Sequence, residues 1–313
     1  MSHIGAPRCL TCVTALGIEH TVDRRLLINV AYRLLGTMAD AEDVVQETYV
    51  RWYRLTDERR DAIESPPAWS VRVTTRICLD ILNSARRRRE HYVGPWIPEP
   101  VPGRGLVESS SATIDPADRV TLDESVTMAV LVVLESMTPA ERVSFVMHDI
   151  FQYSFREISE IVGRSEPACR QLASSARRRV NDARPAPADV QRHAATVIGV
   201  KAALERGDVD ALIGLLDPQV TAVNDGGGRV RAALRPVLGA HKVARFLVGV
   251  LKKVPGIEMS IVDVNGEAGL ILHVDGSPMA VAAMEHRDGL ITRIWMVLNP
   301  DKLGFWSTTT RIA

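Results

Sequence analysis

The stretch from Asp40 to Arg54 reads DAEDVVQETYVRWYR, and its pattern predicts an amphipathic helix. Apolar and aromatic residues recur at about i, i+4 and i+7, which places them on one side of a helix. Asp40 is a suitable N-cap, and the early carboxylates favour the positive N-terminal end of the helix. The packing side would hold Val45, Tyr49, Trp52 and Tyr53, and the outward side Glu42, Asp43, Gln46, Glu47 and Val50.

The acidic outward face suits a protein partner better than a phosphate backbone. The simplest alternative is a solvated face, which is common on amphipathic helices. Val50 fits that alternative poorly, because an apolar side chain surrounded by carboxylates and an amide is typical of an interface core with a polar rim. We therefore predict a protein-binding site made of Asp43, Gln46, Glu47 and Val50.

Composition describes an ordinary globular protein. The chain has 313 residues, enough for two or three domains, with 46% hydrophobic and 24% charged residues. The formal net charge is zero, so the bulk balance gives no indication of nucleic-acid binding. No long apolar run predicts a membrane span, and the N-terminus resembles neither a signal peptide nor an anchor, so we expect a cytoplasmic protein with no membrane partner.

Cysteine usage gives little support for a metal site. Of the four cysteines, only Cys9 and Cys12 have a close C-x-x-C spacing, and no second pair completes a zinc site. We expect reduced thiols in an N-terminal tail, with no metal and no cofactor.

Two breaks divide the chain into three blocks. A stretch rich in Pro, Gly and Ser, VGPWIPEPVPGRGLVESSSATIDP, cannot continue a helix, and DARPAPAD interrupts the pattern a second time. Trp96 and Ile97 are unusually apolar for a linker. The predicted organisation is a flexible N-terminus 1–19, a helical block 20–91, a linker 92–116, a second helical block 117–181, a linker 182–189 and a third block 190–313.

The first two blocks are predicted to be entirely helical. In the second, Thr138, Pro139 and Glu141 form a capping-box pattern for a new helix. The predicted helices are 23–35, 40–55, 67–89 and 122–137.

The third block changes from helices to strands. Its helices should span 190–206 and 208–216. Five runs rich in Val, Ile and Leu then follow, bounded by Gly, Asp and Pro, with turn signals at Asp225 and Asp275. We expect an α+β domain with a curved sheet whose strands are VTAVN, EMSIVDV, AGLILHV, PMAVAAMEH and LITRIWMVL.

Residues 154–180 have the layout of a helix-turn-helix. Gly163 permits the turn, Ser165 can cap the second helix, and Pro167 suits its first turn. The alternative is an ordinary helical hairpin with a basic end. Arg suits guanine and Gln suits adenine in the major groove. The outward positions of the second helix, which we predict to contact DNA, are Glu166, Arg170, Gln171, Ser174, Arg177 and Arg178.

The helix over 67–89 is a second candidate for DNA contact. It ends in a run of arginines, and a polar loop, TDERRDAIESPP, precedes it. Taken alone, such a helix would more often be a solvated basic end. Its candidate residues are Arg72, Arg76, Asn83, Arg86, Arg87 and Arg88.

These motifs together, in this order and spacing, resemble the extracytoplasmic-function group of bacterial sigma factors in the sigma-70 family. The resemblance covers about residues 20–180. It implies that the acidic helix docks on the clamp helices of the largest subunit of core RNA polymerase, that the segment 56–89 melts and reads the minus-10 promoter element, and that the helix-turn-helix reads the minus-35 element. Many relatives have Asn where this chain has Arg76, so a phosphate contact is the safer expectation there.

The third block resembles SnoaL-like domains, which are small cone-shaped α+β folds. YVGPWIPEP in the linker, NDGGGRV at 224–230 and NPDKL at 299–303 carry this resemblance. The implied fold is two all-α sigma domains, the second with a helix-turn-helix, followed by a SnoaL-like domain that regulates sigma activity and docks on the linker. The candidate regulatory residues between domains are Trp96, Asp225, Asn299 and Asp301.

Two other functions remain open from the sequence. A one-component regulator would couple the helix-turn-helix to a ligand-sensing domain, and SnoaL-like folds also include enzymes with an Asp or His in an apolar cone. A lone His on a strand is usually a core or surface residue, so we predict no enzyme and name no catalytic residue, while a small-molecule ligand stays possible. The residues weighed for catalysis are His241, His273, Glu285, His286 and Trp295.

Overall fold

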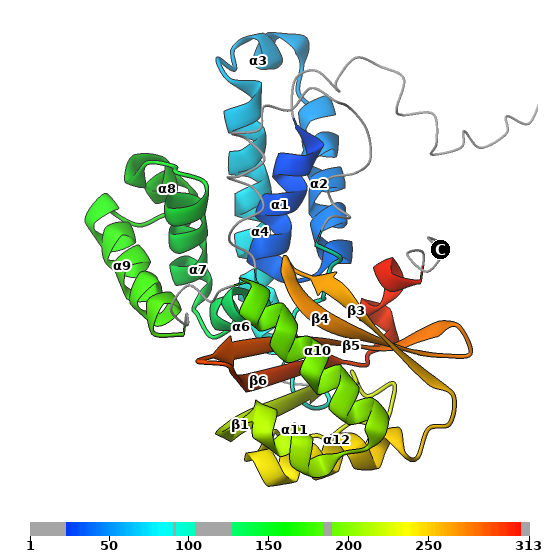
Figure 1. The fold of residues 1–313 in the computed structure, drawn as a ribbon. Coiled ribbons are helices and arrows are strands. Elements are labelled where there is room, and N and C mark those ends of the chain that lie inside the picture. The colour runs from blue at the N-terminus through cyan, green and yellow to red at the C-terminus, as the bar shows by residue number, and fades with distance from the viewer. Residues whose placement is uncertain (1–22, 90–91, 104–126, 184–189, 308–313) are drawn as a thin grey trace, which may run out of the picture.

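A computed structural model describes residues 23–89, 92–103, 127–183 and 190–307, which form two helical domains and one α+β domain (Figure 1). The first helical domain contains α1 (Arg24–Leu35), α2 (Met38–Tyr53), α3 (Asp57–Asp61) and α4 (Pro66–Arg89). Asp23 caps α1 by accepting a hydrogen bond from the backbone N–H of Arg25, and Gly36 ends it with φ +78°.

The sequence misplaced the start of α2. The helix begins at Met38, two residues earlier than predicted, so Thr37 and not Asp40 is its N-cap. Asp40 instead lies in the first turn, where its carboxylate accepts a hydrogen bond from the Thr37 hydroxyl at 2.6 Å. The short helix α3, which Thr56 caps, was also missed, because five polar residues carry no apolar periodicity.

The second helical domain contains α6 (Met128–Glu135), α7 (Pro139–Phe145), α8 (Phe155–Val162) and α9 (Glu166–Ala183). The capping box of Thr138 and Glu141 is present, and α8, Gly163 and α9 form the predicted helix-turn-helix. The helix predicted over 122–137 is described only from residue 127, and its first part lies outside the described residues. Between α7 and α8 lies an unpredicted π-helical turn, η2 (Val146–Ile150).

The third domain wraps a curved sheet around helices α10 (Val190–Arg206), α11 (Val209–Leu215) and α12 (Ala240–Leu251). The strand order is β2-β1-β6-β5-β4-β3, with β1 and β6 parallel and the other pairs antiparallel. The strands are β1 (Leu216–Asp225), β2 (Val237–Leu238), β3 (Ile257–Val264), β4 (Glu267–Val274), β5 (Ser277–Arg287) and β6 (Leu290–Val297), followed by the 3₁₀ turns η3 (Pro300–Lys302) and η4 (Gly304–Trp306).

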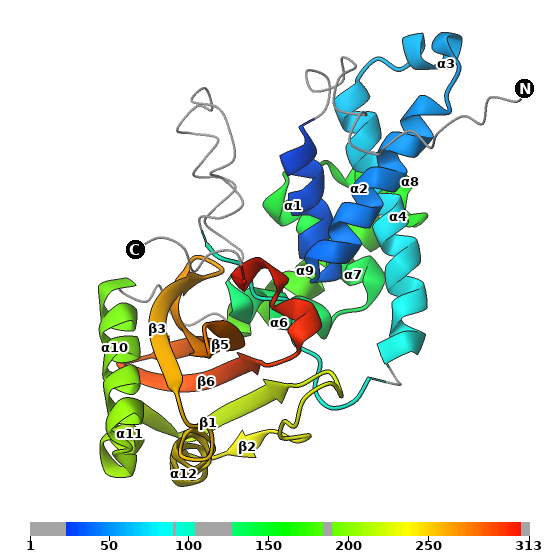
Figure 2. The ribbon, with the colours of Figure 1, turned by 90° about the vertical axis from the view of Figure 1, so that its right-hand side faces the viewer.

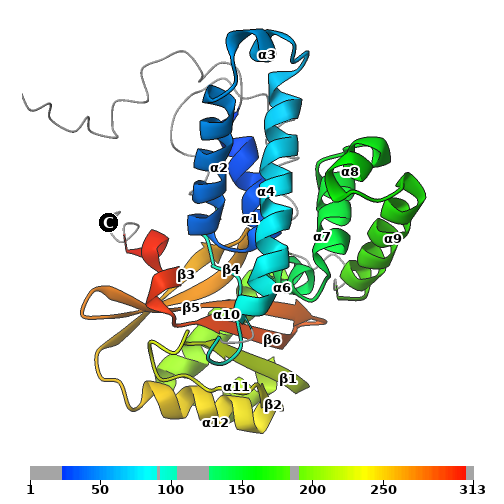
Figure 3. The same cartoon turned by 180° about the vertical axis from the view of Figure 1, so that it is seen from behind.

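The two faces of this sheet have different partners. Helices α10 to α12 cover one face of the sheet (Figure 2). Apolar side chains of the helices and strands, including Leu212, Leu247 and Met284, form a buried core between them. The other face is turned toward the helical domains (Figure 3). On this face Trp295 and Trp306 belong to one buried cluster with residues of the linker and α6. The third domain therefore contacts the rest of the molecule through its sheet.

The two helical domains share one hydrophobic core. Buried residues of α1, α2 and α4 belong to the same cluster as those of α6 to α9. Two buried arginines lie at this boundary: Arg142 donates a hydrogen bond to the carbonyl of Leu34 at 2.8 Å, and Arg33 lies over the ring of Phe151. The two helical domains are thus packed directly against each other.

Within the ranges that the structure describes, no helix has both the length and the apolar character to cross a membrane. The same residues contain no cluster of three or more potential metal ligands. Cys78 and Cys169 are buried free thiols, and Cys9 and Cys12 lie outside the described part of the chain.

Candidate nucleic-acid and partner interfaces

The acidic face of α2 is open to solvent. Asp43 and Gln46 are exposed, Glu47 is half-buried, and the side chain of Val50 is 41% exposed. The opposite side of α2 is held in the core, where the Thr48 hydroxyl lies 3.0 Å from the Thr74 hydroxyl of α4. The four predicted residues therefore share one outward face.

Tyr53 was predicted to pack, but it is 45% exposed. Trp52, also predicted to pack, does so: its ring meets the ring of Trp69 on α4 edge-on, with the ring centroids 5.1 Å apart. Tyr53 follows Val50 by three residues, so both lie on the same part of the helix surface. This pair adds apolar area next to the carboxylates, which is the composition expected of a protein interface.

Helix α4 carries the second set of predicted DNA contacts. Arg72, Arg76 and Asn83 are exposed on it. Arg72 forms an ion pair with Glu160 of α8, 3.3 Å apart, so this part of α4 faces the helix-turn-helix. Arg86, Arg87 and Arg88 belong to the last turn of α4, but their side chains lie outside the described residues.

The recognition helix α9 exposes all its predicted contacts. Arg177 pairs with Asp149 of η2 at 2.5 Å, and the hydrogen bond from its guanidinium to that carboxylate raises the pKa of Arg177. Arg170 lies over the ring of Phe155, with its guanidinium carbon 5.1 Å from the ring centroid. The exposed set is Glu166, Arg170, Gln171, Ser174, Arg177 and Arg178.

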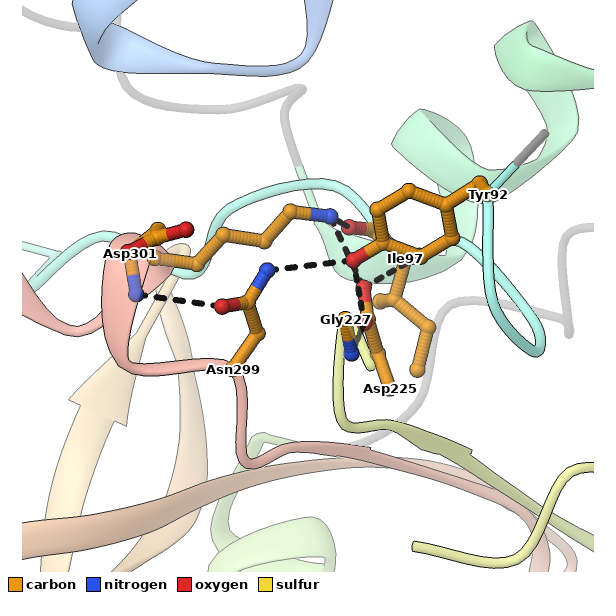
Figure 4. A network of polar contacts seen from close by, with 7 residues as sticks. Tyr92, Ile97, Asp225, Gly227, Asn299 and Asp301 are labelled. Atoms are coloured by element: carbon orange, nitrogen blue, oxygen red, sulfur yellow. Dashed lines mark hydrogen bonds and ion pairs between the residues drawn. The ribbon is translucent and has the colours of Figure 1, made fainter. Parts of the chain in front are cut away.

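A buried carboxylate holds the linker to the third domain (Figure 4). Asp225, at the end of β1, accepts hydrogen bonds from the backbone N–H of Ile97 at 3.0 Å and from the Tyr92 hydroxyl at 2.6 Å. The ammonium of Lys302 lies 2.8 Å from the Asp225 carboxylate and donates to the carbonyl of Ile97. Trp96 covers that ammonium, 4.1 Å from its ring centroid, in a cation–π contact.

Asn299 and Asp301 contribute less directly. The side-chain amide of Asn299 donates to the Tyr92 hydroxyl at 3.1 Å, and its oxygen accepts from the backbone N–H of Asp301. Asp301 points to solvent and pairs with Arg229 of the same domain at 3.1 Å. Burial and the neighbouring Asp225 raise the pKa of Tyr92. Trp96, Asp225 and Asn299 thus lie at the junction between the linker and the third domain, whereas the described ion pair of Asp301 joins two residues of the third domain.

A second contact between domains was not predicted. The turn between β3 and β4 places Asn265 beside Tyr32 of α1, and its amide donates to the tyrosine hydroxyl at 2.9 Å. Tyr32 donates in turn to the carbonyl of Glu99, whose carboxylate accepts from the backbone N–H of Met38 at 2.8 Å. Val101 exchanges hydrogen bonds with Asn265. The linker therefore lies between the first helical domain and the third domain.

The residues weighed for catalysis lie on different parts of the third domain. His241 is exposed at the start of α12, whereas Trp295 is buried on the sheet face toward α6. His286 faces His193 of α10, and Glu285 pairs with Arg293. Among the cavities on the described part of this domain, His241 lines one of about 320 Å³, and another of about 390 Å³ is lined by none of the five.

Comparison with known proteins identifies both helical domains. The model for sigma-70 region 2 matches residues 22–88, and the model for sigma-70 region 4 matches residues 127–180. The chain is 42% identical over 292 residues to the ECF RNA polymerase sigma factor SigJ of Mycobacterium tuberculosis, a match that covers 89% of this chain and 90% of that protein. It is 33% identical over 286 residues to a protein of the same organism described as a probable ECF RNA polymerase sigma factor, SigI, covering 90% and 92%.

The fold agrees with these sequence matches. The crystal structure of the extracytoplasmic-function sigma factor SigJ from M. tuberculosis superposes with a TM-score of 0.69 at 37% identity, covering 92% of this chain and 97% of that one. This confirms the predicted fold class of two helical sigma domains and a C-terminal α+β domain of SnoaL-like type. The alternative of a one-component regulator finds no support among these relatives.

Proposed function

This chain belongs to the extracytoplasmic-function group of the sigma-70 family, and we propose that it is a closed sigma factor whose C-terminal domain restrains promoter binding. As a sigma factor, it directs transcription from specific promoters by RNA polymerase. The domain formed by α1 to α4 is region 2, and the domain formed by α6 to α9 is region 4. The restraint is our own proposal, and it follows from how these regions pack.

Each exposed face has a role in this proposal. The acidic face of α2 docks on the clamp helices of the largest polymerase subunit, with Val50 at the centre and carboxylates around it. The arginines of α4 contact the minus-10 element, and α9 enters the major groove at the minus-35 element. Arginine suits both tasks, since it neutralises phosphate and pairs with guanine in a bidentate manner.

The packing of regions 2 and 4 is the observation that carries the proposal. Their helices share one hydrophobic core, and Arg72 of α4 pairs with Glu160 of α8 at 3.3 Å. The two promoter elements are named for positions about 25 base pairs apart, which at about 3.4 Å per base pair is about 85 Å along the DNA. Helices in contact cannot reach both elements, so the two regions must separate before promoter binding.

The third domain stabilises the closed arrangement through the linker. Lys302 and Asp225 hold Ile97, and Asn265 contacts both Tyr32 and Val101. The same domain buries Met128 and Ala129 of α6, which begins region 4. Releasing the linker would remove contacts that hold region 2 and the third domain together, and we expect this to shift the population toward an open form.

The test is run-off transcription with core polymerase and the variant Asn265→Gly. Asn265 has φ +53°, a backbone conformation that glycine adopts without strain, so the substitution removes only the side chain. It deletes two hydrogen bonds to the linker and α1, each of about 1 kcal/mol. Their loss, together about 2 kcal/mol, should raise transcription from a responsive promoter by up to about thirtyfold at limiting sigma concentration.

Asp275→Gly is the matched control. Asp275 has φ +50° in the exposed turn between β4 and β5, so the change is chemically similar but remote from the linker. Its transcription should equal that of the unaltered protein. Equal or lower output from the Asn265 variant would contradict the restraint, whereas no promoter-specific transcription by any form would contradict the function as a whole.

A further inference from the structure

We propose that Phe155 is a positioning residue for Arg170, and that the π-helical turn η2 thereby sets how α9 reads the minus-35 element. The inference rests on the proposed DNA-reading role of α9. It adds a residue outside the recognition helix to those that determine base preference.

Phe155 is held firmly at the start of α8. Ser154 and Glu157 form a capping box around it, with the backbone N–H of Ser154 2.9 Å from the Glu157 carboxylate and the Ser154 hydroxyl 2.6 Å away. These hydrogen bonds from Ser154 lower the pKa of Glu157. The Phe155 ring is half-buried and packs against the core shared by regions 2 and 4.

The ring touches η2 and α9 at the same time. Its centroid lies 4.0 Å from that of the His148 ring, with 33° between the planes. The guanidinium carbon of Arg170 lies 5.1 Å from the Phe155 centroid, within cation–π range. Phe155 therefore connects the π-helical turn to an exposed arginine of the recognition helix.

The turn itself is fixed. His148 Nδ1 lies 2.9 Å from the carbonyl oxygen of Tyr153, and Gln152 adopts a left-handed conformation with φ +58°. π-Helical turns are rare and occur frequently at functional sites. Asp149, which follows His148 in the same turn, forms an ion pair with Arg177 of α9. Arg177 comes two helical turns after Arg170, so both arginines project from the same side of α9.

Holding Arg170 in place has a consequence for recognition. A free arginine loses rotamer freedom when it binds, whereas a stacked guanidinium has already lost part of it. Bidentate contact with a guanine needs a fixed direction of approach, which discriminates against a wrong base by roughly five- to hundredfold. A contact with phosphate needs charge more than direction, so loss of the stack should affect base preference more than total affinity.

The experiment measures base preference in the holoenzyme. Full-length variants are assembled with core polymerase and bound to a pool of promoter DNAs randomised across the minus-35 element. Arg170→Ala should relax preference at one position, by roughly five- to hundredfold. Phe155→Leu should relax the same position while keeping most of the apolar packing, and Phe155→Tyr should restore it.

Two control variants distinguish a positioning role of Phe155 from a general effect of losing an aromatic ring and from a general loss of DNA binding by α9. Tyr153→Leu removes a neighbouring half-buried aromatic ring and should leave the preference unchanged. Arg178→Ala should weaken binding to all sequences alike. A Phe155→Leu variant that keeps full preference at the Arg170 position, or weakens every position equally, overturns the inference. If Arg170→Ala and Arg178→Ala both leave DNA binding unchanged, the proposed role of α9 fails instead.

Discussion

Asp225 and Lys302 form an ion pair that is almost fully buried, with side chains 0% and 7% exposed. Removing one member leaves the other charge buried without its partner, which costs about 3 to 5 kcal/mol. We therefore expect Asp225→Ala and Lys302→Ala each to destabilise the protein by this amount, and the double variant to cost clearly less than their sum. Urea denaturation of the four proteins gives the coupling.

The exposed pair of Asp301 and Arg229 is the control for that cycle. Its side chains are 59% and 64% exposed, so Asp301→Ala should change stability by less than about 1 kcal/mol. Additive effects of the two buried changes would show that Asp225 and Lys302 act separately.

Glu267, at the start of β4, gives a pH-dependent prediction. Burial, then the neighbouring Glu285 and Asp263, raises its pKa from 4.5 to about 7. The folded protein therefore keeps a proton that the unfolded chain releases, so this contribution to stability is complete below about pH 4.5 and is lost as pH rises through about 7. Glu267→Gln should flatten the change in stability over this window and raise stability above it.

Urea denaturation at several pH values measures this effect. Glu258→Gln on the neighbouring strand, where the side chain is exposed, should leave the pH profile unchanged. If the stability of Glu267→Gln depends on pH in the same way as that of the unaltered protein, the Glu267 carboxylate must be freely accessible to solvent.

Single residues also mark the limit of sequence reasoning. Trp96, Asp225 and Asn299 were predicted as regulatory residues from a family resemblance. Tyr32 and Asn265, which are 233 positions apart, were not, because each looks ordinary in its own segment. An Asn-Gly pair such as Asn265 and Gly266 is typical of a hairpin turn, but nothing local indicates which distant surface that turn meets.

Among the elements, α2 presents the simplest test of polymerase binding. Reversing two charges on its exposed face, Asp43→Lys with Glu47→Lys, should lower the affinity for core polymerase by more than about tenfold, because like charges would then face the complementary surface. Co-purification with core enzyme or fluorescence anisotropy measures this.

A double reversal elsewhere controls for net charge. Asp210→Lys with Glu258→Lys changes charge by the same amount on exposed positions of the third domain. If this control weakens polymerase binding as much as the α2 variant, the acidic face of α2 has no specific role.

The turn of the helix-turn-helix depends on one glycine. Gly163 has φ +70°, and an added Cβ would meet no atom within 4 Å, so only backbone strain opposes substitution. Gly163→Ala should cost about 1 kcal/mol, and Gly163→Asn less, because Asn tolerates this conformation better. Faster amide hydrogen exchange in α8 and α9 would measure this loss of local stability. If Gly163→Ala and Gly163→Asn destabilise the two helices equally, the loss of stability has a cause other than the positive φ at residue 163.

Most elements could be predicted because their signals are local. The capping box at Thr138, the glycine turn at Gly163 and the apolar runs that form the strands of the third domain are each signalled within a few residues. The π-helical turn η2 was missed because it continues the apolar pattern of α7 without a break. Its contacts with Phe155 and Arg177 depend on tertiary packing and leave no pattern in the sequence.

For the whole molecule, the linker pattern predicted separate domains but not their closure. The apolar stripes of α1, α4 and α7 indicate burial without indicating a partner, and they meet in one core. Likewise, Met128 looks like a core residue of its own domain but packs in the cluster under the sheet of the third domain. Apolar periodicity predicts that one face of a helix or strand is buried. Which other element buries that face is decided by the fold of the complete chain.

Closure leads to a prediction for the intact protein. Arg72→Cys and Glu160→Cys place two thiols across the contact between regions 2 and 4, where the native side chains pair at 3.3 Å. Cys78 and Cys169 are buried, and Cys9 and Cys12 can be replaced by Ser.

Joining the new thiols with a short reducible cross-linker should remove most promoter-directed run-off transcription, since the regions could no longer span about 85 Å of DNA. Reduction should restore the transcription that the double variant shows before cross-linking. The same cross-linker between Lys201→Cys and Glu205→Cys, within α10, should have no effect. Full transcription by the cross-linked closed protein would show that regions 2 and 4 need not separate, and the restraint would then have to act at another step.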